Sequence, residues 1–163
     1  MGPLAATAEN IAELLTKSVK QRRLLKDKRK PVYSKFAQAL AARAEASQIE
    51  PTLIKPLVER SLTKLETGYT WRADPRLRLA SPIRLSEKQL AYTIANIQAP
   101  CLLIEGDKGY ITEQTTFASR KAWFKKLTSF CFQGGHHVHL EQSELTAKTI
   151  EGFLVGLNKT ASD

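Results

Sequence analysis

The histidine-rich stretch near the C-terminus holds the residue types best suited to chemistry. A β-prone run from Ser129 to Phe132 is followed by Gln133, two glycines and His136. Glycines let a backbone turn sharply at a strand end, and a residue on that turn is held close to the sheet edge. An imidazole titrates near neutrality and is the usual general base of nucleophilic hydrolysis. The stretch is therefore typical of one half of a catalytic site, with His136 as its candidate residue.

Two other interpretations of these histidines stay open. His136 could cap the following helix or satisfy a loop carbonyl. His136, His137 and His139 could ligate a metal, yet side chains at i, i+1 and i+3 of a turn seldom converge, and no cysteine or carboxylate cluster joins them in the sequence. The glycine context favours catalysis, and we expect neither a metal nor a cofactor.

The C-terminal third must supply the elements that position His136, and its pattern is α/β. Residues 101–105 form an apolar run bounded by Pro100 and Gly106, which is typical of a buried parallel strand. A helix (about 115–127), the strand 129–132 and a last helix are expected to follow. Two strands are too few for a stable parallel sheet. We expect a partner chain or preceding residues to complete it.

The first hundred residues are predicted to be mainly helical, because apolar residues recur at helical spacing behind capping or first-turn residues. The first expected helix is capped by Thr7 and runs to Leu25, and the second follows Ser34. The third runs from Pro51 to Leu65, with Pro56 delaying its start. The fourth follows Ser86, which forms a capping box with Gln89 before the apolar residues Leu90, Ile94 and Ile97. Residues 68–86 are rich in arginine and proline, which predicts an ordered loop with one short strand.

Composition limits the class of protein. The apolar fraction of 42% and the charged fraction of 25% are those of a globular protein. No apolar run approaches the roughly 20 residues of a membrane helix, and the N-terminus lacks a signal-peptide pattern. Cys101 and Cys131 lie in apolar runs, which indicates buried reduced thiols rather than a disulfide. These features predict a cytoplasmic protein.

The net charge of +9 is carried by the first hundred residues, which hold 18 Lys and Arg against nine Asp and Glu. The basic run from Lys17 to Lys30 could bind nucleic acid or an anionic membrane surface. Its apolar face is well formed and it has no interleaved aromatic residues, so a solvated helix face is the favoured interpretation. A nucleic-acid partner is not expected, and a basic binding module is the least favoured function.

The C-terminal motifs resemble those of the α/β-hydrolases. The segment Pro-Cys-Leu-Leu-Ile-Glu-Gly-Asp from Pro100, the Gly-Gly-His turn, Leu140-Glu141-x-x-Glu144 and Ile150-x-x-Phe153-Leu154 are similar to the last two strands, the histidine turn and the last helix of that family. Ser143 stands where the family usually has a proline, and it can cap the helix as well. The resemblance covers about residues 98–155.

The preceding segment resembles the helical cap of the serine hydrolase-like branch, on the motifs Lys-Arg-Lys-Pro-Val-Tyr (28–33) and Gly-Tyr-Thr-Trp-Arg (68–72). The resemblance implies an α/β fold with a basic helical cap (1–98), the C-terminal part of the hydrolase sheet (99–158) and a tail (159–163). It also implies that the first strands of the sheet lie outside this sequence, with Met1 as an internal residue or a truncated start.

In this family a serine on a Gly-x-Ser-x-Gly elbow attacks the substrate, a histidine activates the serine, and an acid orients the histidine. Matched by position, His136 is the base. The 163 residues contain no Gly-x-Ser-x-Gly, so the chain alone is predicted to be inactive. The usual acid position is Gly109. Asp107 is our candidate acid, Glu113 lies nearby, and some members place the acid after the sixth strand.

The resemblance implies hydrolysis of an ester-like or small acyl substrate without a cofactor. Tyr69 and Trp71 are candidates to line the substrate pocket, or they merely pack within the cap. Two alternatives stay open beside the hydrolase. The chain could be a non-catalytic remnant, or it could be a subunit whose partner chain completes the sheet.

Overall fold

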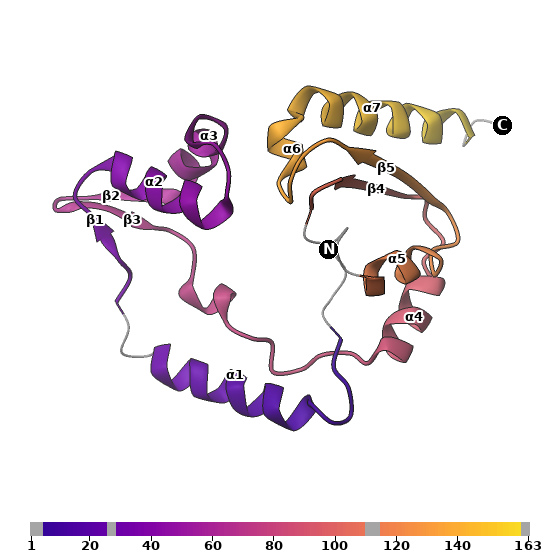
Figure 1. Ribbon diagram of the computed structural model, residues 1–163, viewed down its shortest axis with the longest axis horizontal. Coiled ribbons are helices and arrows are strands. Elements are labelled where there is room, and N and C mark those ends of the chain that lie inside the picture. Colours follow the sequence, from indigo (N-terminus) through magenta and orange to yellow (C-terminus); the bar gives the residue numbers. More distant parts are fainter. Residues whose placement is uncertain (1–4, 26–28, 110–114, 161–163) are drawn as a thin grey trace. The chain divides into compact units, whose positions relative to one another are not determined.

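The computed structural model describes residues 5–25, 29–109 and 115–160 of the 163-residue chain. Its contacts divide the chain into two compact units, Leu4–Ser86 and Glu87–Asp163 (Figure 1). The helix α4 (Glu87–Ala95) therefore belongs to the unit that holds the histidines, although the sequence placed residues up to 98 with the cap. By sequence, the first unit carries the entire net charge of the chain.

The unit Glu87–Asp163 is built on two parallel strands, β4 (Cys101–Gly106) and β5 (Leu127–Phe132). Their register pairs Cys101 with Leu127 and Gly106 with Phe132. Three further helices follow in chain order, α5 (Thr115–Lys121), α6 (Val138–Glu141) and α7 (Ser143–Thr160). Figure 1 shows α7 over one face of the strand pair and α4 and α5 on the other side. The predicted strand–helix–strand–helix order is confirmed.

Two element boundaries differ from the sequence prediction. The helix expected over about 115–127 ends at Lys121, because the backbone then tightens into successive i→i−3 hydrogen bonds as far as Phe124. Leu127 is consequently the first residue of β5 rather than the end of a helix. The last helix is divided at Gln142, and α7 begins at Ser143.

The two parallel strands are only partly covered. Among the residues of β4 only Gly106 is buried, and Phe130 of β5 is 41% exposed. Parallel strands are normally buried on both faces. Within the described residues β4 pairs with β5 alone, as expected from the sequence. Within the part of the chain that the structure describes, the strand pair thus has less cover than parallel strands normally have.

Two ion pairs connect the helices of this unit to its strands and to one another. Glu105 of β4 pairs with Lys121 of α5, and Glu87 of α4 pairs with Arg120 of α5. Arg120 is 7% exposed, and its guanidinium lies 5.1 Å from the centre of the Phe117 ring. These contacts fix α4 and α5 against the strands that lead to the histidines.

The unit Leu4–Ser86 combines three helices with a small antiparallel sheet of order β1-β3-β2. Its elements in chain order are α1 (Ile11–Leu25), β1 (Val32–Tyr33), α2 (Phe36–Ser47), α3 (Pro51–Ser61), β2 (Leu62–Leu65), β3 (Gly68–Trp71) and a 3-10 helix (Pro75–Arg78). The helices α2 and α3 pack on each other, and Ile54 and Val58 of α3 are almost fully buried. This unit has the better-formed core.

The strands β1 and β2 were missed by the sequence analysis. The helix expected to run from Pro51 to Leu65 ends at Ser61, and the following four residues form β2. Pro56 lies inside α3 and does not delay its start at Pro51. Gly68 begins β3 with φ of 141°, and a Cβ there would lie 2.1 Å from the Tyr33 carbonyl oxygen. Only glycine lets β1 and β3 approach this closely.

The helix α1 is confirmed, but its polar face makes the contact with the rest of its unit. Ser18 is fully buried and its hydroxyl donates to the Ala80 carbonyl oxygen at 2.9 Å. The apolar side chains of Ile11, Leu15 and Val19 are 43–49% exposed. Among the described residues, no helix is both long and apolar enough to span a membrane.

Candidate active site

The histidine turn, residues 133–137, lies where β5 ends beside the end of β4. The hydrogen-bond ladder of the two strands continues past them, because Asp107 N–H donates to the Phe132 carbonyl at 2.9 Å and Lys108 N–H donates to the Gly134 carbonyl at 3.0 Å. Carboxyl ends of adjacent parallel strands are where α/β proteins place their ligands. The topology therefore brings Asp107 next to the turn that carries His136.

Two glycines make this close approach possible. A Cβ on Gly106 would lie 2.2 Å from the Gly135 carbonyl oxygen and 2.5 Å from that of Gly134. Gly134 has φ of 155°, and a Cβ there would lie 2.4 Å from Glu141 Oε2. Side chains at these positions would collide with backbone or carboxylate atoms. The glycines expected to permit a sharp turn are thus required by contact as well as by conformation.

Three side chains hold the backbone of the histidine turn. Asp107 Oδ1 accepts a hydrogen bond from Gly134 N–H at 2.8 Å, and Glu141 Oε2 accepts one from Gly135 N–H at 2.7 Å. The amide of Gln142 donates to the Gln133 carbonyl at 3.1 Å. Hydrogen bonds to carboxylates are stronger than those between neutral groups. Three consecutive residues before His136 are therefore anchored.

The side chain of His136 is exposed at this turn. Its ring lies edge-on to that of His137 with centroids 5.2 Å apart, and His137 lies edge-on to His139 at 5.8 Å. The N-cap of α6 is His137, whose side chain makes no capping hydrogen bond. His136 thus precedes the capping position, which disfavours a role as a helix cap. Within residues 5–25, 29–109 and 115–160, no group of three His, Cys, Asp or Glu side chains could hold a metal.

No protein-family model matches the sequence. A serine hydrolase-like protein from Danio rerio is 27% identical over 104 residues, which is 60% of this chain and 32% of that protein. A hypothetical protein of known structure from Pseudomonas aeruginosa is 26% identical and superposes with a TM-score of 0.84 over 94% of this chain. The thioesterase domain of the curacin biosynthetic pathway (20% identity, TM-score 0.73, 92% of this chain) has the same fold.

The chain has an α/β-hydrolase fold, which it shares with these structures. A Mycobacterium tuberculosis esterase (15% identity) has the same fold, with a TM-score of 0.64 over 93% of this chain. The chain spans about one third of the curated relative and about half of the solved structures. It covers 32% of the Danio rerio protein, 55% of the Pseudomonas structure and of the thioesterase domain, and 52% of the esterase.

The residues considered for a catalytic acid all follow β4 in the sequence. Gly109, at the usual acid position, is buried and its N–H donates to the Gly106 carbonyl at 3.0 Å. Glu113 lies outside the described residues. Asp107 is exposed, and its carboxylate contacts the histidine turn through Gly134. Its assignment as the acid stays a prediction.

Tyr69 and Trp71 both lie on β3 of the unit Leu4–Ser86. The Tyr69 ring packs edge-on against Phe36 at 6.1 Å, and the Trp71 ring packs edge-on against Tyr33 at 6.2 Å. Each ring is half-buried within its own unit. Packing within the unit, one of the two interpretations, is therefore observed, and lining of a substrate pocket stays a prediction.

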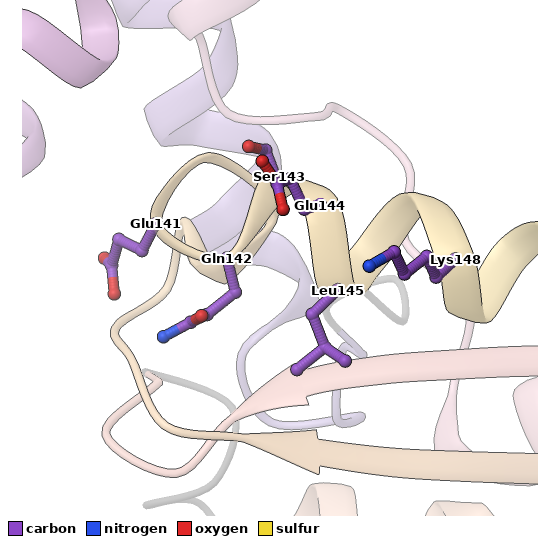
Figure 2. A pocket seen from close by; sticks show the side chains of 6 residues that line it. All are labelled: Glu141, Gln142, Ser143, Glu144, Leu145 and Lys148. Atoms are coloured by element: carbon purple, nitrogen blue, oxygen red, sulfur yellow. The ribbon is translucent and has the colours of Figure 1, made fainter.

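A hollow that no sequence pattern predicted lies at the junction of α6 and α7. Its volume is about 400 Å³, and it is lined by Glu141, Gln142, Ser143, Glu144, Leu145 and Lys148. Figure 2 shows the side chains of Glu141 and Gln142 extending from this junction toward the loop that leaves β5. The spacing Leu140-Glu141-x-x-Glu144 was the only available signal, and it indicated a helix start rather than a contact with the histidine turn.

Proposed function

We propose that the chain forms the cap and the C-terminal part of a serine-dependent α/β-hydrolase that cleaves an ester-like or small acyl substrate. The observation that carries this proposal is the place of His136. It follows two glycines at the carboxyl end of β5, directly beside the end of β4, on a backbone held by three side chains. An exposed imidazole on an anchored backbone at this edge suits a general base.

In this mechanism His136 takes the proton from a serine hydroxyl while the serine oxygen attacks the acyl carbon of the substrate. The imidazolium then gives the proton to the leaving group as the carbon–oxygen or carbon–sulfur bond breaks, which leaves an acyl-enzyme. A water molecule, deprotonated by the same imidazole, releases the acid. The serine elbow is not among these 163 residues and has to come from elsewhere.

Asp107 is our candidate for the acid that orients His136. Its carboxylate lies at the end of the neighbouring strand and already contacts the turn through Gly134. Tyr69 and Trp71 are proposed to lie along the substrate path provided by the cap. The choice of an acyl substrate is supported by the two structural neighbours that are a thioesterase domain and an esterase.

The proposal is tested in two steps. The chain alone should hydrolyse a p-nitrophenyl ester no faster than its His136→Ala variant, because it has no nucleophile elbow. The reading frame upstream of Met1 is then examined for Gly-x-Ser-x-Gly. If it continues there, the longer protein should be esterolytic, and His136→Ala should lower kcat by about 10³-fold or more.

His139→Ala is the matched control for this experiment, because His139 is also exposed and lies three residues further along. We expect it to leave kcat within about twofold of the parent protein. Full esterase activity in the His136→Ala protein would contradict the proposal. Activity of the isolated chain that is lost on His136→Ala would contradict the need for an external nucleophile.

A second candidate function is supported by the partly covered strand pair. Within the described residues the outer edge of β4 pairs with no strand, so the chain could be one subunit of a pair whose partner supplies the remaining strands. Size-exclusion chromatography of the chain purified from its native source separates the two possibilities. A stable heteromer would favour the subunit, and a single longer polypeptide would favour the hydrolase.

A further inference from the structure

The carboxylate of Glu141 contacts the histidine turn directly, and the function described so far assigns this contact no role. It is the last residue of α6, and its carboxylate returns to accept the hydrogen bond of Gly135 N–H at 2.7 Å. Gly135 immediately precedes His136. The same carboxylate lies so close to Gly134 that an added Cβ would be 2.4 Å from Oε2. Glu141 thus covers both glycines of the turn.

The helix itself does not need this side chain. The α6 turn is closed by its backbone, because Leu140 N–H and Glu141 N–H both donate to the His137 carbonyl, at 2.8 Å and 3.3 Å. The carboxylate of Glu141 is therefore available to act on the residues before the helix. Two glycines in sequence are the most mobile backbone that a chain can have. A fixed base at the next residue requires that this mobility be removed.

We propose that Glu141 is a positioning residue for His136. Its carboxylate holds Gly135 from the helix side while Asp107 holds Gly134 from the strand side. The two bonds together fix the backbone from which the imidazole projects. This role rests on the proposed hydrolase function, because only a reaction at the imidazole gives the orientation of His136 a purpose.

The test uses the chain as it stands and compares three variants by NMR. Glu141→Ala removes the carboxylate, and Glu141→Gln keeps its shape and one acceptor oxygen without the charge. Glu144→Ala is the matched control, since Glu144 lines the same hollow three residues later and is exposed. Exchange of the Leu103 amide reports whether β4 and β5 remain paired.

We expect Glu141→Ala to speed hydrogen exchange at the Gly135 amide by about 10- to 100-fold, since a hydrogen bond to a charged group is lost. The order parameter of the His136 backbone should fall from about 0.85 to below about 0.6. Glu141→Gln should give a smaller change in the same direction, and Glu144→Ala should change neither quantity by more than about twofold.

Unchanged exchange at Gly135 in Glu141→Ala, with β4 and β5 still paired, would overturn the role of Glu141. Faster exchange at Gly135 with no change at His136 would also overturn it, because the bond would then be merely structural. If the Leu103 amide loses protection in Glu141→Ala, the strands are no longer paired in that variant. Glu141→Gln then tests the role of Glu141, by exchange at the Gly135 amide and by the order parameter of the His136 backbone. None of these measurements depends on ester hydrolysis, so they fail or succeed separately from the His136 activity test.

Discussion

The units Leu4–Ser86 and Glu87–Asp163 bury their apolar residues to different degrees. In the first, Ile54 and Val58 are at most 1% exposed beneath α2, and a three-stranded antiparallel sheet is formed entirely within the unit. In the second, the strands β4 and β5 are half-buried or exposed at every residue except Gly106. Antiparallel hairpins can be completed by neighbouring residues, whereas a parallel sheet needs strands and helices from distant parts of a chain.

From this contrast we expect the unit Leu4–Ser86 to be the more stable of the two by itself. The histidine turn lies in the unit whose strands are more exposed, so the proposed chemistry depends on the less well-buried part of the chain. Each unit contains one of the two tryptophans, Trp71 and Trp123. A Trp123→Phe chain therefore reports unfolding of the first unit by fluorescence, and a Trp71→Phe chain reports unfolding of the second.

The largest expected effect compares one isoleucine from each unit. Ile54→Ala should lower the free energy of unfolding of the first unit by about 2–5 kcal/mol, because it opens a cavity at a fully buried site. Ile104→Ala on the half-buried strand β4 should cost the second unit about 1 kcal/mol. Urea unfolding followed by tryptophan fluorescence measures both. Equal costs would contradict the contrast between the two cores.

A second prediction concerns the approach of β4 to the histidine turn. Gly106→Ala should destabilise the unit Glu87–Asp163 by about 2–4 kcal/mol, since its Cβ would lie 2.2 Å from the Gly135 carbonyl oxygen. Gly152→Ala in α7 is the control, because a Cβ there meets nothing within 4 Å. It should stabilise the helix by up to about 1 kcal/mol. A neutral Gly106→Ala would show that the turn is free to move away.

A third prediction compares the two edges of the strand β4 by hydrogen exchange. Cys101 N–H donates to the carbonyl of Lys126, the residue before β5, and Asp107 N–H donates to that of Phe132, the last residue of β5. The amides of Leu103 and Glu105 therefore face β5 as well. Those of Leu102 and Ile104 face the outer edge. We expect the latter pair to exchange at least about tenfold faster in the isolated chain. Slow exchange at all four would mean that a further strand covers the edge.

The smallest expected effect is a pH dependence confined to the first unit. Hydrogen bonds from Arg76 lower the pKa of Asp74 from its ordinary value of 3.8 to about 2. The lowered folded-state pKa means that the pair stabilises the fold above about pH 4, and that this contribution is lost as the pH falls toward 2. Because the pair is exposed, the effect should be small.

Asp74→Asn tests that pH dependence. The difference in urea midpoint between the parent and Asp74→Asn should shrink between pH 4.5 and pH 2.5, read from Trp71 fluorescence. Glu59→Gln is a suitable control, since Glu59 and Lys55 form an exposed pair at 3.9 Å along one helix. A constant difference across this range would contradict the pairing of Asp74 with Arg76.

Local patterns predicted the elements whose identity is set by neighbouring residues. The apolar run 101–105 correctly predicted the strand β4, and the glycines before His136 correctly predicted the histidine turn. Both features depend on only a few neighbouring residues. The strand β2 was assigned to a helix, since Leu62 and Leu65 continue the helical spacing of Val58. Its pairing with β3, and that of β3 with Val32, depends on distant segments that no local pattern contains.

The candidate site shows the same division. The sequence placed His136 on a turn and Asp107 at the end of the neighbouring strand, and the fold brings these two segments together. The bond from Gly135 to Glu141 could not be predicted, because it requires α6 to fold back over the residues that precede it. The hydrogen bond from the Gln142 amide to the Gln133 carbonyl could not be predicted either, because nothing in the sequence distinguishes Gln142 from a surface residue.

The hydrogen bonds from Gly134 to Asp107 and from Gly135 to Glu141 hold the histidine turn through its backbone, and this has an evolutionary consequence. The contacts of Gly106, Asp107 and Glu141 are made to main-chain atoms of the glycines, and none of these contacts involves the imidazole. A lineage could therefore exchange the histidine for another residue and keep the loop intact. The shape of the loop alone would then fail to separate an active hydrolase from an inactive descendant, and the residue at position 136 would have to be read as well.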